Sequence, residues 1–141
     1  MRTWITITLI VISLTCFSQW KPQPLPLSLT YCAGAFKGTA DYLQFHYSGQ
    51  NTWLNPDLSW RNKWKNGDPS HGEKFPGSST VFVCFTDGWH LMNTGNKVCV
   101  LGALCLKIGK KQPLKYYLYD LVIYTFAYSA GFWTTYEILY K

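Results

Sequence analysis

Apolar residues are concentrated towards the two ends of the chain, and a polar stretch over residues 47–76 separates them. Apart from a short run near the start, the apolar segments cover residues 27–46, 81–106 and 116–140. Each segment is long enough for a helix, and the last exceeds the roughly 20 residues that cross a bilayer. The pattern therefore predicts an all-α fold.

We expect residues 81–106 and 116–140 to form two transmembrane helices that pair as a hairpin, with residues 27–46 as a further, membrane-associated helix. The connection between the hairpin helices contains Gly109 and Pro113, which favour a turn. Lysines gather around this turn, as the positive-inside rule expects of a cytoplasmic loop. They are Lys107, Lys110, Lys111 and Lys115.

Turn-forming residues indicate where the predicted helices begin and break. Three prolines keep residues 21–26 extended, so we expect the first helix to begin at Leu27. Ser78 or Ser79 is expected to cap the second helix. The polar run at 93–96 is the point where that helix would be interrupted.

The polar stretch 47–76 is rich in Gly, Pro, Asn and Asp, which disfavour regular structure. It also contains Trp53, Trp60 and Trp64, whereas disordered segments are poor in aromatic residues. Tryptophan is typical of the interface between membrane and water. We therefore expect an ordered, aromatic-rich loop that lies along this interface.

Residues 1–18 have the order of a signal peptide: a basic start, a short apolar run and small residues before Gln19. We expect residues 1–18 to be cleaved and residues 19–141 to form a single helical membrane domain. The alternative is an uncleaved anchor, because residues 3–20 carry no charge.

The composition favours lipid as a partner. Aromatic residues make up 18% of the chain and charged residues only 14%, whereas about a quarter of an ordinary soluble domain is charged. A secreted soluble domain is the alternative. The net charge of +6 is spread along the chain and does not form one basic face, so no nucleic-acid partner is expected.

The five cysteines form neither a Cys-x-x-Cys pair nor an even set, and most lie in apolar runs, where cysteine acts as a small hydrophobic residue. A disulfide framework or a cysteine metal centre is therefore disfavoured. The sequence also lacks the Gly-x-Ser-x-Gly motif of serine hydrolases and a glycine-rich phosphate loop. Whether the protein is an enzyme stays open.

Five ionisable residues stand out against apolar surroundings and form the candidate polar cluster: Asp41, His46, Asp87, His90 and Glu137. Asp87 and His90 are three residues apart, which places them on one face of a helix. With the lysine turn as a common floor and a rise of about 1.5 Å per residue, Asp87, His90 and Glu137 reach a similar level. If the lysine turn is cytoplasmic, a cluster of all five residues at the outer interface is geometrically allowed.

Two interpretations of this cluster stay open. Charged groups in membrane helices are costly, so they tend to be paired and functional. Hydrogen-bonded pairing that fixes helix packing is the favoured interpretation. The alternative is a catalytic site or a site for a divalent metal, with Asp87, His90 and Glu137 as candidate ligands.

Gly34 and Gly38 form a Gly-x-x-x-Gly pair within the predicted first helix. This spacing lets two helix backbones approach closely in a bilayer. We therefore expect the pair to serve helix packing, including packing against a protein partner or a second copy of the chain.

Several short motifs together resemble a family of small, uncharacterised bacterial membrane proteins. The motifs are Ala33-Gly34-Ala35 with Gly38, Asp41 and Leu43-Gln44-Phe45-His46, then Asn55-Pro56, Ser59-Trp60-Arg61-Asn62-Lys63, Lys65-Asn66-Gly67-Asp68-Pro69, Phe75-Pro76-Gly77-Ser78, Thr86-Asp87-Gly88-Trp89-His90, Ala127-Tyr128 and Gly131-Phe132. The resemblance covers most of the mature chain. It implies a cell-envelope protein of the bacterial inner membrane and transfers no activity or site residue.

A looser likeness in layout is to VanZ-like envelope proteins, which place an Asp-x-x-His pair on one membrane helix and an acidic residue on a later one. Asp87, His90 and Glu137 correspond to this layout. The long polar loop departs from that family, so the likeness concerns layout alone.

The expected function is that of a small integral membrane protein with a structural role or with a protein or lipid partner. The alternative is a membrane-interface enzyme, or a protein that handles ions or protons, built on the Asp/His/Glu cluster. Asp87→Asn and His90→Gln distinguish the two, because a structural pair tolerates these near-isosteric changes and a catalytic or metal site does not.

Overall fold

The computed structural model describes residues 20–141, so the signal peptide or anchor predicted over residues 1–18 lies outside the described residues. Three α-helices make up most of this part: α2 (Pro24–His46), α3 (Gly88–Cys105) and α4 (Leu114–Tyr140). Four short 3-10 helices, η1 (Pro56–Leu58), η2 (Lys65–Gly67), η3 (Pro69–His71) and η4 (Val83–Phe85), lie in the segment between α2 and α3. No strand forms over residues 20–141, which confirms the predicted all-α class.

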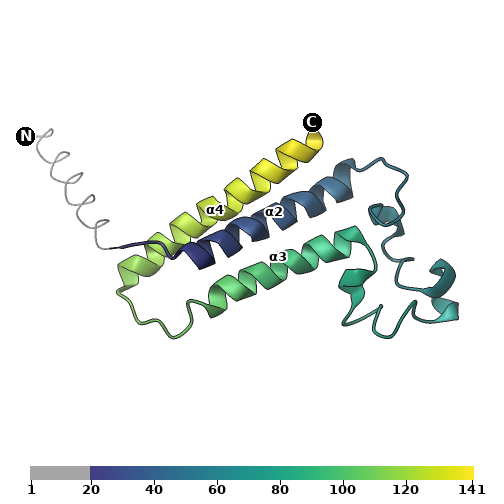
Figure 1. Ribbon diagram of the computed structural model, residues 1–141, viewed down its shortest axis with the longest axis horizontal. Helices are drawn as coiled ribbons and strands as arrows, with labels where there is room; N and C mark the ends of the chain where they lie inside the picture. The colour runs from purple at the N-terminus through teal and green to yellow at the C-terminus, as the bar shows by residue number, and fades with distance from the viewer. Residues whose placement is uncertain (1–19) are drawn as a thin grey trace, which may run out of the picture.

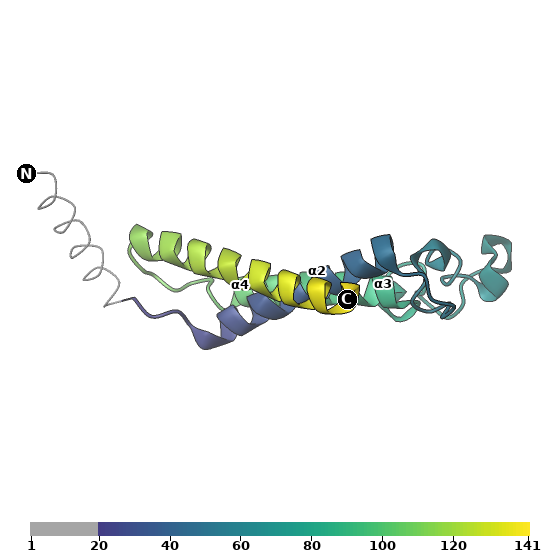
Figure 2. The same cartoon turned by 90° about the horizontal axis from the view of Figure 1, so that it is seen from above.

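The three helices lie in one thin layer, with α2 between α3 and α4 (Figures 1 and 2). Helix α2 packs against both of its neighbours, whereas the backbones of α3 and α4 hardly approach each other and side chains such as Asn96 and Tyr128 make the contact between them. The sequence predicts that α3 and α4, which follow one another in the chain, pair as a hairpin. This prediction is wrong, because α2 lies between them. Their connection is long enough to let α2 lie between them.

Helices α2 and α4 cross in close backbone contact at three glycines. A Cβ atom added at Gly34 would lie 1.9 Å from the carbonyl oxygen of Tyr128, and one at Gly131 would lie 2.0 Å from that of Tyr31. At Gly38 it would lie 2.6 Å from the carbonyl oxygen of Phe132. No side chain fits at such distances, so the Gly34 and Gly38 pair is used within the chain and packs α2 against α4.

Helix α2 begins earlier than its prolines suggested. It starts at Pro24, and Pro26 lies in its first turn. The first backbone N–H groups of a helix have no partner within the helix, so prolines at these positions cost nothing and their fixed φ favours the helical conformation. The expectation that residues 21–26 stay extended is therefore wrong from Pro24 onwards.

Helix α3 begins later than expected and runs without a break. Its N-cap is Asp87, not Ser78 or Ser79, because Asp87 is extended and its carboxylate accepts a hydrogen bond from the backbone of His90. The run 93–96 stays helical, because its asparagine side chains bond to backbone carbonyls and to a tyrosine hydroxyl instead of competing with the helix.

Few apolar side chains are buried in this thin layer. Over residues 20–141 the buried apolar residues are Ala33, Ala40, Leu43 and Ala103, and most large apolar side chains of α3 and α4 are exposed. No helix in this range is both long enough and apolar enough to cross a membrane, so the two transmembrane helices predicted from the sequence are not found there. In α4 the reason is its content of tyrosine, threonine and charged residues.

Candidate functional site: a tryptophan-walled hollow beside Asp87 and His90

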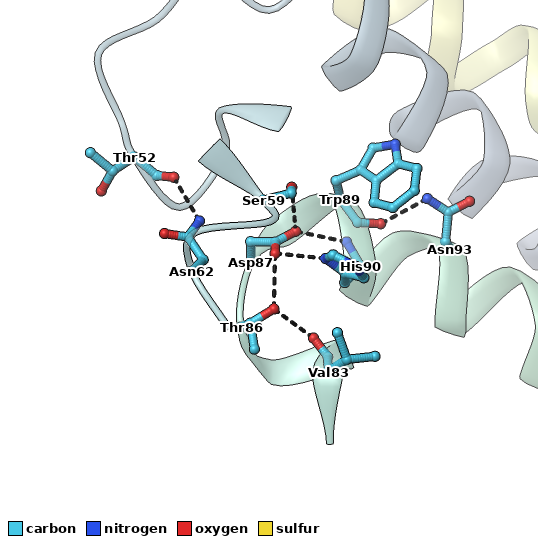
Figure 3. A network of polar contacts seen from close by, with 9 residues as sticks. All are labelled: Thr52, Ser59, Asn62, Val83, Thr86, Asp87, Trp89, His90 and Asn93. Carbon is cyan, nitrogen blue, oxygen red and sulfur yellow. Dashed lines mark hydrogen bonds and ion pairs between the residues drawn. The ribbon is translucent and has the colours of Figure 1, made fainter. Parts of the chain in front are cut away.

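The carboxylate of Asp87 is the centre of a hydrogen-bond network at the start of α3 (Figure 3). Its Oδ1 accepts from the backbone N–H of His90 at 2.9 Å and from the hydroxyl of Ser59 at 3.0 Å. Its Oδ2 lies 2.9 Å from the hydroxyl of Thr86, which donates to it, and 2.7 Å from Nδ1 of His90. Asp87 is fully buried, so its charge is balanced by these four donors and not by water.

Burial raises the pKa of the Asp87 carboxyl, but the hydrogen bonds from His90 and Thr86 outweigh it and hold that pKa below its ordinary value. Asp87 is therefore ionised at neutral pH. An ionised carboxylate that faces Nδ1 of His90 keeps a proton on that nitrogen.

This geometry sets the chemistry that His90 can perform. With Nδ1 donating to Asp87, Nε2 is the nitrogen that can accept or release a proton. No residue of the described chain makes a hydrogen bond to Nε2. The edge of the ring lies against Trp89, with the ring centres 5.0 Å apart.

His90 lines a hollow of about 420 Å³ at the end of the helical layer. The end of α2, the turn around η1 and the start of α3 build its walls. The lining residues are Gln44, Phe45, Pro56, Asp57, Ser59, Trp60, Lys63, Trp89 and His90. The indole of Trp89 donates to Oε1 of Gln44 at 3.1 Å, which fixes one wall. Aromatic walls with a few polar groups are typical of a small-molecule site.

The segment between α2 and α3 is held in place by its own polar side chains. Ser78 is fully buried, and its hydroxyl donates to the carbonyl oxygen of Lys63 at 2.7 Å. The carboxylate of Glu73 accepts from the backbone N–H of Gly77 at 2.8 Å and from both the N–H and the hydroxyl of Ser79. Lys63 and its neighbours are therefore carried by an ordered loop.

The predicted cluster divides into separate pairs. Only Asp87 and His90 meet. Asp41 pairs with Lys37 one turn earlier on α2. Glu137 lies 3.9 Å from Lys141 on α4.

His46, at the end of α2, shares a hydrogen bond of 2.5 Å with the hydroxyl of Tyr136. Within residues 20–141 no three His, Cys, Asp or Glu side chains come together as a group that could hold a metal ion. The level of each residue along its helix does not predict contact, because α2 lies between α3, which carries His90, and α4, which carries Glu137.

A second buried polar centre lies at Asp120 on α4. The candidate residues chosen from the sequence do not include it. Asp120 is 5% exposed. Its carboxylate lies 2.5 Å from Nζ of Lys107 and accepts from Gln112 at 2.8 Å and from the indole of Trp20 at 3.2 Å. A lone carboxylate in an apolar helix, close to a lysine-rich turn, was the available signal.

Comparisons of this chain with protein-family models, with curated proteins and with solved structures find no match.

Proposed function

We propose that this chain is a small membrane protein of the bacterial envelope whose helical layer lies in the lipid bilayer and whose role is structural or to bind lipid or a protein partner. The observation that carries the proposal is the exposure of large apolar side chains on a helical layer with almost no apolar core. Val98, Phe126 and Ile138 are 61%, 67% and 74% exposed. In water these side chains would have no apolar partner, whereas lipid chains would cover them.

Several polar groups of the long helices are satisfied internally, as a bilayer requires, although the buried hydroxyl of Tyr124 on α4 has no hydrogen-bond partner. The hydroxyls of Thr125 and Thr134 donate to backbone carbonyls one turn earlier, at 2.7 and 2.9 Å. The hydroxyl of Tyr128 is 3.1 Å from Nδ2 of Asn96, which donates to it, and Asp120 is paired with Lys107. Part of the hydrogen-bonding capacity of the polar residues in α4 is therefore hidden from lipid.

The segment between α2 and α3 suits the interface of the same bilayer. Trp53 and Trp60 are 40% and 51% exposed, and Phe82 and Phe85 lie exposed near the start of α3. Aromatic side chains beside charged residues are typical of the headgroup region. The family resemblance noted in the sequence agrees with this location and adds the bacterial inner membrane.

The Gly34 and Gly38 pair contributes to the proposal in a different way than the sequence suggested. Both glycines are covered by α4. A protein partner or a second copy would therefore bind through the exposed faces of α3 and α4 and not through these glycines.

Vesicle flotation tests the proposal. The full chain, expressed with membranes present, is expected to float with vesicles and to stay with them at alkaline pH. Phe126→Lys places a charge near the middle of α4 and should lower incorporation strongly, because such a charge costs about 2.5 to 3.5 kcal/mol in a membrane helix. The matched control Ser48→Lys adds the same charge in the exposed loop and should float like the wild type. Release of the wild type at alkaline pH would contradict the proposal.

A second candidate function, proton transfer at the membrane interface, is favoured by one observation. A buried, ionised Asp87 accepts from Nδ1 of His90, a residue that lines the hollow, and this is the arrangement of a general base. Asp87→Asn and His90→Gln would abolish such an activity in a protein that is still folded and membrane-bound. If the only effect of both changes is on stability, the pair is structural.

A further inference from the structure

The lining of the hollow beside His90 includes groups of both charges. Lys63 and the amide of Gln44 are donors, because Oε1 of Gln44 already accepts from Trp89 and its NH₂ group is left to donate. Asp57 is the acidic residue of the lining.

We propose that this hollow binds the headgroup of a zwitterionic phospholipid, in which a phosphate and an ammonium group are joined by a short linker. The phosphate would be bound by Lys63 and the amide of Gln44, and the ammonium group by the carboxylate of Asp57. The inference rests on the proposed membrane location and specifies the lipid class that the interfacial loop recognises.

The aromatic lining favours a lipid over a free phosphoester. Phe45 and Trp60 are 67% and 51% exposed at the hollow. The guanidinium of Arg61 lies 5.1 Å from the centre of the Trp60 ring and covers it with a second cation. A soluble ligand gains little from exposed rings, whereas the glycerol and the upper acyl chain of a lipid would cover them.

The charge balance of the lining favours a zwitterionic headgroup over an anionic one. Lys63 and Asp57 have opposite charges, with Arg61 on the Trp60 ring as a further cation, and Asp57 would repel a ligand that carries only negative charge. An anionic lipid would be expected if the lining were basic throughout, which it is not.

The test titrates the detergent-solubilised full chain with three probes, followed by line broadening in ³¹P NMR. The probes are dihexanoyl phosphatidylethanolamine, dihexanoyl phosphatidylglycerol and phosphoethanolamine. We expect saturable binding of phosphatidylethanolamine, tighter than that of the other two. Lys63→Gln and Asp57→Asn should each weaken it by about tenfold or more, since each removes a charged partner. Both side chains lie at the surface or half-buried, so both variants should fold.

The matched controls are Lys74→Gln and Asp68→Asn, which make the same charge changes in the same loop outside the hollow. They should leave binding unchanged. Equal effects of Lys63→Gln and Lys74→Gln, or equal binding of both lipids, would overturn the inference, and tight binding of phosphoethanolamine would assign the hollow to a soluble phosphoester. Flotation of a chain that binds neither lipid would leave the proposed function intact and remove this inference alone.

Discussion

Nδ1 of His90 lies 2.7 Å from Oδ2 of Asp87, while Oδ1 of the same carboxylate accepts the backbone N–H of His90 at 2.9 Å. One aspartate therefore caps helix α3 and orients the imidazole on its first turn. This double use explains why a fully buried carboxylate is kept at the edge of the hollow. The two roles can also be tested separately. A neutral side chain such as asparagine can cap α3, but it cannot replace the carboxylate that orients the imidazole of His90.

Removal of the Asp87 carboxylate should destabilise the protein. Asp87→Ala removes the cap and leaves the buried hydroxyl of Ser59 without its partner, whereas the hydroxyl of Thr86 keeps the carbonyl oxygen of Val83, at a cost of about 3 kcal/mol. Asp87→Asn keeps a capping oxygen and should cost less than half of that. Denaturant unfolding in detergent measures both. Glu137→Gln, at a side chain that is 41% exposed and only loosely paired, should change stability by no more than about 0.5 kcal/mol. Equal losses for Asp87→Ala and Glu137→Gln would contradict the assignment.

The stability of the protein should fall in acid. The pKa of the Asp87 carboxyl is below its ordinary value of 3.8, so the unfolded state binds this proton first as the pH falls. The stabilisation is fully present above pH 3.8 and is lost as the pH falls below it through the pKa of the folded state. Asp87→Asn should flatten this part of the profile. The pKa values of Asp68 and Glu73 are also lowered, by hydrogen bonds from Ser70 and from Ser79 and Gly77, so part of the acid loss should persist in the variant.

The crossing of α2 and α4 should not tolerate a single added methyl group. Gly34→Ala would place Cβ 1.9 Å from the carbonyl oxygen of Tyr128, which forces the helices apart and should cost about 2 kcal/mol or more. Gly102→Ala is the matched control on α3, where Cβ would lie 3.5 Å from a methyl group of Leu29. It should be neutral or slightly stabilising, because alanine favours helix. Thermal unfolding of both variants checks this, and a stable Gly34→Ala would place the crossing elsewhere.

The Lys107 and Asp120 pair should be replaceable together but not singly. Asp120→Asn leaves the ammonium of Lys107, whose side chain is only 14% exposed, without a counter-charge and should cost about 3 kcal/mol. The double change Lys107→Met with Asp120→Asn removes both charges and should recover most of that loss. Unfolding of Lys107→Met, Asp120→Asn and the double variant gives the comparison. Strict additivity of Lys107→Met and Asp120→Asn would mean that the pair contributes no coupling.

Local sequence patterns predicted the local features well. The apolar segments became helices, the Asp87 and His90 spacing became a bonded pair, and Gly34 and Gly38 lie where two backbones meet. Each of these depends on residues within about one or two helical turns of one another.

The arrangement of the helices was harder to predict from the sequence, because it depends on contacts between distant segments. Helix α2 lies between α3 and α4, and its contact with α4 needs glycines on both helices. The sequence of one segment alone does not reveal such a contact. The number of residues along each helix therefore places Glu137 level with Asp87. It does not show which helix lies next to each of them. The partner of Asp120 was hidden for the same reason, since Lys107 approaches it across the turn between α3 and α4.

The central claim is that lipid covers the exposed faces of the helical layer. The direct measurement is the accessibility of nitroxide labels to oxygen and to a water-soluble nickel complex, in vesicles, with the native cysteines replaced by serine. Labels at Phe126→Cys on α4 and at Lys74→Cys in the loop compare two exposed positions. We expect the label at position 126 to be reached by oxygen and shielded from nickel, and the label at position 74 to be reached by nickel. Equal nickel accessibility at both positions would show that water, not lipid, covers α4, and would contradict the account.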